Sequence, residues 1–404
     1  MKTKEQDKKK QQETLALKEE KTMGNTKNQG SKTSKTPGSE KVFYGDSTKV
    51  NAVGHYDFND YVKLESKNQK MEGFDPQYRD FVDYIMKITH NIWEEKGIGV
   101  IYDTYHNNVT MHTGSKSIVG IKEIISGTMQ TLHSMPDRRL IGQNVIWSPL
   151  GENGYLSSHR VMSTATNTGD SMFGKATGKK LTFRTVIDCA CENNRIYEEW
   201  LVRDNLTIVE QMGLDPKAVA KNMAKKHDKN DRVTPESFGL GENMRGQYMP
   251  EKYTRKDESV GEWMLEMLSH VYNYRLFNEV RDYYSDSACM HYVGNKDLHG
   301  HNEIQGMFIS FFASFPNAEF MVDRVTCNEK PEKGEWDVAV RWRINGIHEG
   351  IGFFQEPTGK PVNILGINHY HVKNNEIVEE WVTFDALDVL RQVVDTDETP
   401  EKED

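Results

Sequence analysis

This chain contains one sequence pattern written twice. Residues 177–204 reappear at 358–385, displaced by 181 positions, and the shared positions include an Asn-Asn pair followed by a Glu-Glu-Trp triplet. Upstream, the displacement falls to 180 for Gly120 and Gly300 and to 179 for His112 and His291. Insertions of single residues in loops produce such steps. Because solenoid repeats span only about 20–50 residues, the pattern predicts two tandem domains of one fold.

The rest of the chain is arranged around these two copies. The lysine-rich N-terminal segment is too polar to form a packed core, so it is expected to be disordered. It either binds a partner or is a solvated extension without one. Each copy has the size of a domain with a single core. The predicted segments are a disordered basic tail at 1–50, a first domain at 75–212, a helix and linker at 213–258, a second domain at 259–394 and an acidic tail at 395–404.

Charge and composition narrow the class of partner. The formal net charge is −10, which gives no electrostatic footprint for nucleic acid or an anionic membrane. No apolar run approaches a membrane span, and no apolar segment follows the early lysines as a secretory signal requires. We therefore expect a cytoplasmic protein that binds a small molecule. Cys189 and Cys191 are expected to be buried apolar side chains rather than metal ligands.

Periodicity predicts the same order of elements in both copies, helices first and strands after them, which is an α+β arrangement. A curled antiparallel sheet backed by helices would leave a cavity between the two. In the first copy we expect helices at 78–95 and 121–133 and strands at 109–112, 139–148, 154–166, 179–191 and 195–202. In the second we expect helices at 260–275 and 302–314 and strands at 287–293, 319–328, 336–346, 348–356, 362–372 and 376–383.

These motifs resemble a known family. Each copy has a His on its first strand, a Gly that opens the following helix, an Asn-Asn hairpin, Ile-x-Glu-Glu-Trp and an Asp four residues after the Trp. This order is similar to that of the SnoaL-like polyketide cyclases of the nuclear transport factor 2-like superfamily, over about 75–212 and 258–394. The resemblance implies two tandem cone-shaped barrels, each with a deep pocket. It also implies pairing through the sheets, as an internal pseudo-dimer or as a homodimer.

The resemblance also implies catalytic residues. In SnoaL-like cyclases the Asp after the Trp is a general acid/base beside a His on the preceding strand, and neither a metal nor an organic cofactor takes part. Asp385 and Asp204 hold the matching positions. Burial at a pocket floor would raise the pKa of such a carboxyl group toward neutrality.

The partners of Asp385 depend on one hairpin. A three-residue loop, 373–375, would bring His369 and His371 to the same face of the sheet as Trp381 and Asp385, whereas a two-residue loop would separate them. We favour the three-residue loop with a bulge, because Asn tolerates the left-handed conformation that it needs.

The first copy has a different set. At the positions of His369 and His371 it has Asp188 and Ala190, so the expected set there is Arg184, Asp188 and Asp204. Two Asp around an Arg resemble the Asp-Arg-Asp group of limonene epoxide hydrolases, and a structural ion pair is the alternative.

Four more side chains are expected to bind substrate or, alternatively, to pack in the core: His112, His291, Trp200 and Trp381. The resulting hypothesis is a cofactor-independent acid/base enzyme of the cyclase, isomerase, hydrolase or lyase type, acting on a small organic molecule in an enclosed pocket. The alternative is a non-catalytic small-molecule-binding protein with one or both pockets inactive. Divergence between the copies at 188/369 and 190/371 favours specialised pockets.

Overall fold

A computed structural model of the chain describes residues 41–54, 57–65, 67–114, 116–226 and 251–394, which lie in one compact unit beginning at Lys41. The expected tail up to residue 40, most of the linker (227–250) and the acidic tail lie outside the described residues. Residues Val42–Gly45, which the sequence analysis assigned to the tail, form strand β1 and pair in parallel with β10 of the second domain.

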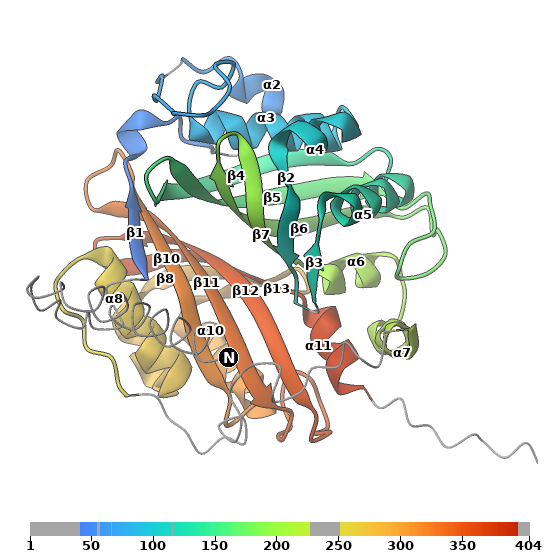
Figure 1. Cartoon of the computed structure of the whole chain (residues 1–404). Coiled ribbons are helices and arrows are strands. Elements are labelled where there is room, and N and C mark those ends of the chain that lie inside the picture. Colours follow the sequence, from blue (N-terminus) through green and yellow to red (C-terminus); the bar gives the residue numbers. More distant parts are fainter. Residues whose placement is uncertain (1–40, 55–56, 66, 115, 227–250, 395–404) are drawn as a thin grey trace, which may run out of the picture. The chain divides into compact units, whose positions relative to one another are not determined.

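The first domain has a six-stranded sheet in the order β3-β2-β7-β6-β5-β4, with helices α3 to α5 before and between its first strands (Figure 1). Its neighbours pair antiparallel except β2 and β7, which are parallel. The elements are η1 (Ser47–Lys49), α2 (Phe58–Tyr61), α3 (Phe81–Trp93), α4 (Ile98–Thr104), β2 (Tyr105–His112), β3 (Ser117–Val119), α5 (Ile121–Ser134), β4 (Arg139–Leu150), β5 (Gly154–Thr166), β6 (Lys180–Glu192), β7 (Arg195–Arg203), α6 (Asn205–Gln211) and α7 (Pro216–Lys226).

The second domain repeats this arrangement in a seven-stranded sheet, ordered β1-β10-β11-β12-β13-β8-β9. Its β8 again pairs in parallel with β13, so neither sheet is wholly antiparallel. The elements are α8 (Val260–Met267), η5 (Leu268–Asn273), η6 (Phe277–Glu279), α9 (Val280–Tyr283), β8 (Tyr284–Tyr292), β9 (Lys296–His299), α10 (Gly300–Ser314), β10 (Glu319–Glu329), β11 (Glu335–Ile347), β12 (Pro361–Lys373), β13 (Glu376–Phe384) and α11 (Ala386–Val393). The fold is α+β, with two tandem domains built on two separate, curved and unclosed sheets.

One predicted strand is wrong. Residues 348–356 form a loop that runs against α10. A Cβ atom on Gly350 would lie 2.0 Å from the carbonyl oxygen of Ala313, and one on Gly352 would lie 2.3 Å from that of Ser310. The segment therefore approaches the helix backbone more closely than a strand with side chains could.

The hairpin that carries His369 also differs from the prediction. Lys373 pairs with Glu376, so the loop has two residues, Asn374 and Asn375, both with positive φ (53° and 61°). A bulge at Val378, further along the strand, then shifts the register, and His369 pairs with Trp381. The shared face of these two residues is confirmed, whereas the loop length was wrong, because the extra residue lies in the strand and not in the turn.

That shared face is the outer face of the sheet, where the two sheets contact each other. The guanidinium of Arg160 lies 3.4 Å from the ring centroid of Trp381, and that of Arg341 lies 3.5 Å from that of Trp200. Both the arginines and the tryptophans are 181 positions apart, so the two cation–π contacts are equivalent in the two copies. Apolar side chains of both sheets pack beside them: Val186, Val202, Leu365 and Ile367.

A buried ion pair joins the sheets at the same face. Nη1 of Arg341 donates to Oδ2 of Asp188 at 3.0 Å, and both side chains are almost fully buried. Next to it, Ser158 and His369 are hydrogen-bonded at 2.9 Å between Oγ and Nε2. At the edge of β4, the side-chain amide of Asn328 bonds to both the backbone N–H and the C=O of Trp147.

We expect Arg341→Ala to destabilise the protein by about 3–5 kcal/mol, because it leaves the carboxylate of Asp188 buried without its cation. Arg343→Ala is the matched control on the same strand. Its pair with Asp323 is more exposed, and its loss should cost no more than about 1 kcal/mol. Urea unfolding of both variants measures the difference, and equal losses would contradict the assignment of the ion pair to the sheet contact.

Candidate functional site

Most of the sequence-predicted site residues lie at the contact between the sheets. Asp188 and His369 are the buried groups described above, and burial shifts their pKa values in opposite directions, upward for Asp188 and well downward for His369. His371 lies near the end of its strand, where Nε2 is 2.9 Å from Oε2 of Glu335. The structure therefore does not bring these three side chains together in a pocket.

The predicted substrate-binding residues form two equivalent clusters on the same outer face. His112 lies 2.9 Å from Oε1 of Glu198 and stacks on Trp200, with ring centroids 5.4 Å apart. His291 lies 3.1 Å from Oε1 of Glu379 and stacks on Trp381 at 5.3 Å. The tryptophans of both His-Glu-Trp clusters stack on arginines of the opposite sheet.

The two aspartates after the tryptophans are helix caps. Asp204 begins α6 and accepts hydrogen bonds from the backbone N–H of Thr207 and of Gly294. Arg184 donates to the carbonyl oxygen of His291, while Asp188 pairs with Arg341, so the Asp-Arg-Asp group does not form. Asp385 begins α11 and accepts from Asn205 of the first domain.

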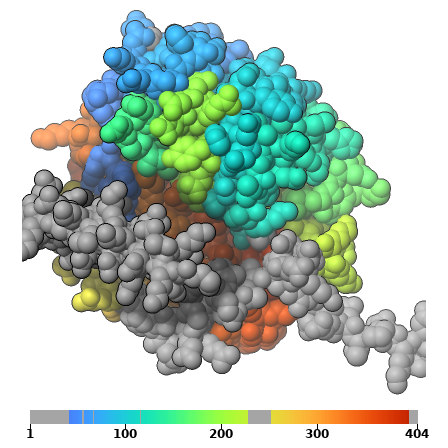
Figure 2. All heavy atoms as spheres, viewed as in Figure 1, coloured from blue at the N-terminus to red at the C-terminus, as the bar shows by residue number. Residues whose placement is uncertain are grey.

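A cavity of about 720 Å³ lies inside the first domain, between its helices and the inner face of its sheet. Figure 2 shows one side of the molecule, on which blue, cyan and green residues of the first domain lie together. Asp385 is a lining residue that comes from the second domain. The walls come from α3 (Ile88, Ile92, Trp93), α5 (Thr128, Thr131), β6 (Thr185, Ile187, Cys189), β7 (Glu199, Leu201, Arg203) and α6 (Asn205, Ile208).

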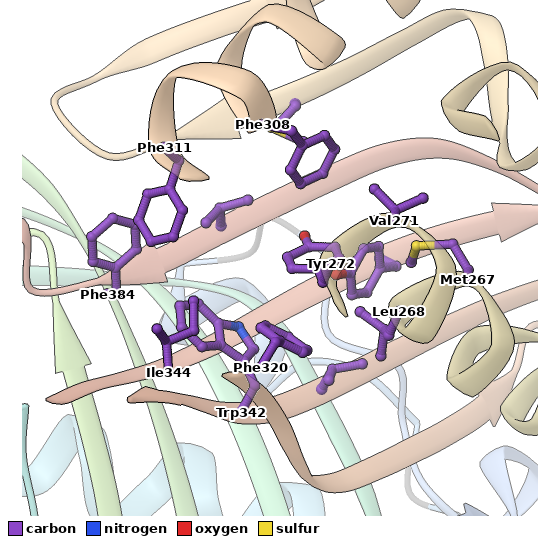
Figure 3. Packing of buried hydrophobic residues seen from close by; sticks show 14 of the residues in the cluster. Met267, Leu268, Val271, Tyr272, Phe308, Phe311, Phe320, Trp342, Ile344 and Phe384 are labelled. Atoms are coloured by element: carbon purple, nitrogen blue, oxygen red, sulfur yellow. The ribbon is translucent and has the colours of Figure 1, made fainter. Parts of the chain in front are cut away.

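The second domain has large side chains where the first has its cavity. In Figure 3, Phe311 points toward Phe384, with ring centroids 5.7 Å apart, and Tyr272 packs against Phe308 and Phe320 at 4.9 and 4.4 Å. Equivalent residues of the two copies are 180 positions apart in the helices α5 and α10 and 181 positions apart in the strands. Thr128, Thr131, Cys189 and Arg203 of the cavity correspond to Phe308, Phe311, Tyr370 and Phe384. These aromatic rings occupy the space that remains open in the first domain.

Glu199 is the buried acid of this cavity. It lies on the inner face of β7, is 4% exposed, and its Oε2 accepts a hydrogen bond of 2.9 Å from the hydroxyl of Tyr105. Burial raises the pKa of Glu199 to about 7, and the bond from Tyr105 opposes this shift in part. A carboxyl group that titrates near neutral pH can both accept and return a proton.

The equivalent acid in the second domain has more partners. Oε2 of Glu380 accepts from Tyr284 at 2.7 Å, and Oε1 accepts from Asn368 at 2.9 Å and from Tyr272 at 3.2 Å. At the positions of Asn368 and Tyr370 the first domain has Ile187 and Cys189, which cannot make these bonds to Glu199. The same acid is thus enclosed by hydrogen-bond donors in one copy and lines a largely apolar cavity in the other.

Other polar groups of the cavity were also absent from the sequence-based set. His159 lies on β5 and is 3% exposed, and its buried Nε2 has no hydrogen-bond partner within the described ranges of the chain. Burial lowers its pKa to about 3, which keeps the ring neutral. Glu199 had one signal in the sequence, an acid repeated in both copies on a strand of apolar residues. His159 has no counterpart in the second copy, where Val340 stands.

One group of the described residues has the spacing of metal ligands. The ligand atoms of Cys289, His291 and Asp297 lie within 4.8 Å of one another. Both ring nitrogens of His291 already contact carboxylates, Asp297 at 2.7 Å and Glu379 at 3.1 Å. The cluster lies on β8 and β9, outside the cavity.

Comparison with known proteins identifies the family. The profile of the SnoaL-like polyketide cyclases matches residues 84–212 and 262–393, together more than half of the chain. The chain belongs to this family. A search of the curated proteins found no match.

Solved structures with this fold include SnoaL-like proteins that each align with about one third of the chain. At these identities the likeness concerns the fold alone. They include a SnoaL-like polyketide cyclase from Agrobacterium tumefaciens (15% identity, 33% of this chain and 97% of that one, TM-score 0.27), TsrD from Streptomyces laurentii (14%, 35% and 98%, 0.29) and IdmH from Streptomyces antibioticus (16%, 32% and 97%, 0.27).

Family and fold together support a small-molecule-binding protein of the nuclear transport factor 2-like type. They do not name a reaction. Across the described part of the chain, every helix is too short or too polar to cross a lipid bilayer.

We expect Glu199→Gln to stabilise the protein in a pH-dependent way. Between pH about 4.5 and 7 the folded protein keeps the Glu199 proton that the unfolded chain has lost, so the contribution of this group to stability falls as pH rises. The advantage of the variant over the wild type should therefore grow by on the order of 3 kcal/mol from pH 4.5 to 8.

Urea unfolding at pH 5 and pH 8 measures this difference. Glu192→Gln, at the exposed end of β6, is the control and should show no such dependence. An equal effect of Glu199→Gln at both pH values would mean that the carboxyl group is not held protonated.

Proposed function

We propose that the cavity of the first domain binds a small organic molecule, and that Glu199 transfers a proton to and from it as a cofactor-independent acid/base catalyst. The observation that carries this proposal is the acid itself, a buried carboxyl group with a pKa of about 7 in the wall of a cavity of about 720 Å³. Perturbed titratable groups in a concave site are typical of catalysis.

Each neighbour of Glu199 has a role in this proposal. Tyr105 donates to Oε2 and so fixes the orientation of the carboxyl group. The apolar wall around Ile187, Cys189 and Leu201 excludes water, which keeps the proton on Glu199 until a substrate carbon or oxygen competes for it. The reaction class is proton transfer at a carbon next to a carbonyl group, as in cyclases and isomerases.

Asp385 is the second proton-transfer group of the proposal. It lines the same cavity, and burial together with the nearby charge of Asp388 raises its pKa to about 7. Among the acid/base residues that the sequence suggested, it alone lines this cavity. The second domain, with aromatic rings in its interior, then serves as a structural partner that supplies this one side chain.

Binding is tested by filling the cavity with a residue from the other copy. Thr128→Phe places the side chain of the equivalent Phe308 into the cavity, and we expect it to abolish binding of the fluorescent apolar probe N-phenyl-1-naphthylamine. Ser126→Phe, on the exposed side of the same helix, should leave probe binding unchanged. Equal binding by both variants would place the probe outside the cavity.

Catalysis is tested by exchange of carbon-bound protons. In D₂O, the wild type should accelerate deuterium incorporation next to the carbonyl groups of some members of a panel of apolar ketones and 1,3-diketones, followed by NMR. Glu199→Gln should slow this exchange by about 100-fold or more, as expected for loss of a general base. Glu192→Gln is the control. Exchange at the wild-type rate in Glu199→Gln would remove this residue from the mechanism.

A further inference from the structure

The cavity of the first domain has two arginines at the end remote from Glu199. Arg203 is the last residue of β7 and lies on the same face as Leu201 and Glu199, and about 13 Å of strand separates the Cα atoms of Glu199 and Arg203. Arg138 lies between α5 and β4. Both line the cavity, and burial, together with charge repulsion from Arg203, lowers the pKa of Arg138.

Arg138 is a buried cation that has no carboxylate partner among the residues that the structure describes. It is 6% exposed, and its Nε and Nη2 both donate to the neutral Oγ of Ser163, at 3.2 and 2.9 Å. Its guanidinium lies over Trp93 at 4.5 Å and Phe183 at 5.3 Å from the ring centroids. Nη1 is buried with no hydrogen-bond partner among the described residues. A guanidinium stays protonated, so this charge is uncompensated inside the protein.

Arg203 is also incompletely satisfied. Its Nε is buried without a hydrogen-bond partner in the described part of the chain. Burial lowers the pKa of Arg203, and the nearby Asp385 opposes this shift only in part. No ion pair forms between them within 4.0 Å, and Asp385 itself has a pKa of about 7. Of the other acids that line the cavity, Asp170 pairs with Lys175 at 2.7 Å and Glu199 lies on the strand toward the opposite end.

We infer that the ligand of this cavity is an apolar molecule with a carboxylate group, which Arg138 and Arg203 bind while the rest of the molecule extends toward Glu199. The inference rests on the proposed function, since it names the class of substrate for the same site. A planar carboxylate matches the edge of a guanidinium whose faces are covered by aromatic rings. The apolar wall between the two ends, which includes Ile88, Ile92 and Leu201, fits the body of such a molecule.

Displacement of N-phenyl-1-naphthylamine from the full-length protein tests this inference, with decanoate and decanol as competitors of matched shape. For the wild type, decanoate should compete at concentrations about 10- to 100-fold lower than decanol, the ratio expected for one charge-assisted hydrogen bond. Arg138→Met and Arg203→Met should each reduce the affinity for decanoate selectively. Arg139→Met, the exposed neighbour outside the cavity, should keep the wild-type ratio.

The outcomes separate the two proposals. Equal competition by decanoate and decanol in the wild type overturns the carboxylate inference and leaves small-molecule binding intact. A preference that persists in the Arg138→Met, Arg203→Met double variant also overturns it, as do equal losses for both competitors, which would indicate a structural role only. If the wild type does not bind the probe, both this inference and the proposed function are wrong.

Discussion

The central strands of both sheets are buried on both faces, and this constraint governs where polar side chains can lie. The inner face of each sheet faces its own helices, while the outer face contacts the other sheet. Nine of the thirteen residues of β5 are buried, as are nine of thirteen in β12. A polar group on such a strand needs a partner from another element. Arg341 with Asp188, and Ser158 with His369, meet this requirement across the sheet contact.

The inner faces of the two sheets consist of equivalent positions of the repeat, and they differ mainly in the volume of the side chains at these positions. A buried Glu with a Tyr donor is present in both, Glu199 with Tyr105 and Glu380 with Tyr284. Around this shared pair, small or polar side chains in one copy correspond to aromatic rings in the other, as at Thr128 and Phe308. The aromatic side chains of the second domain pack closely against one another. The first domain instead has an open cavity, which Arg138 lines with an Nη1 that has no hydrogen-bond partner among the described residues.

Much of the fold follows from the sequence alone. The displaced repeat predicts two domains, and apolar periodicity predicts most helices and strands, because those patterns depend on local burial. The site was harder to predict. The extra residue was expected in the loop 373–375 but lies at Val378 in the strand, and His369 and Trp381 share a face in either case. Alternation also cannot tell an inner face from an outer one when both are buried. His369 and Asp188 therefore looked like pocket residues, while Arg138 lies in a short connection that periodicity does not describe.

The sheet contact has one more consequence, which concerns its symmetry. In a homodimer, the two-fold axis repeats every substitution in both subunits. An acid introduced at one position would therefore also stand at the equivalent position of the partner. Here the two halves belong to one polypeptide, and position 188 can be Asp while its counterpart, 369, is His. The two Arg-Trp stacks are equivalent in the two halves, whereas the residues beside them differ between the halves. Because the two halves belong to one polypeptide, the contact between them need not be self-complementary, and Asp188 and His369 make it asymmetric.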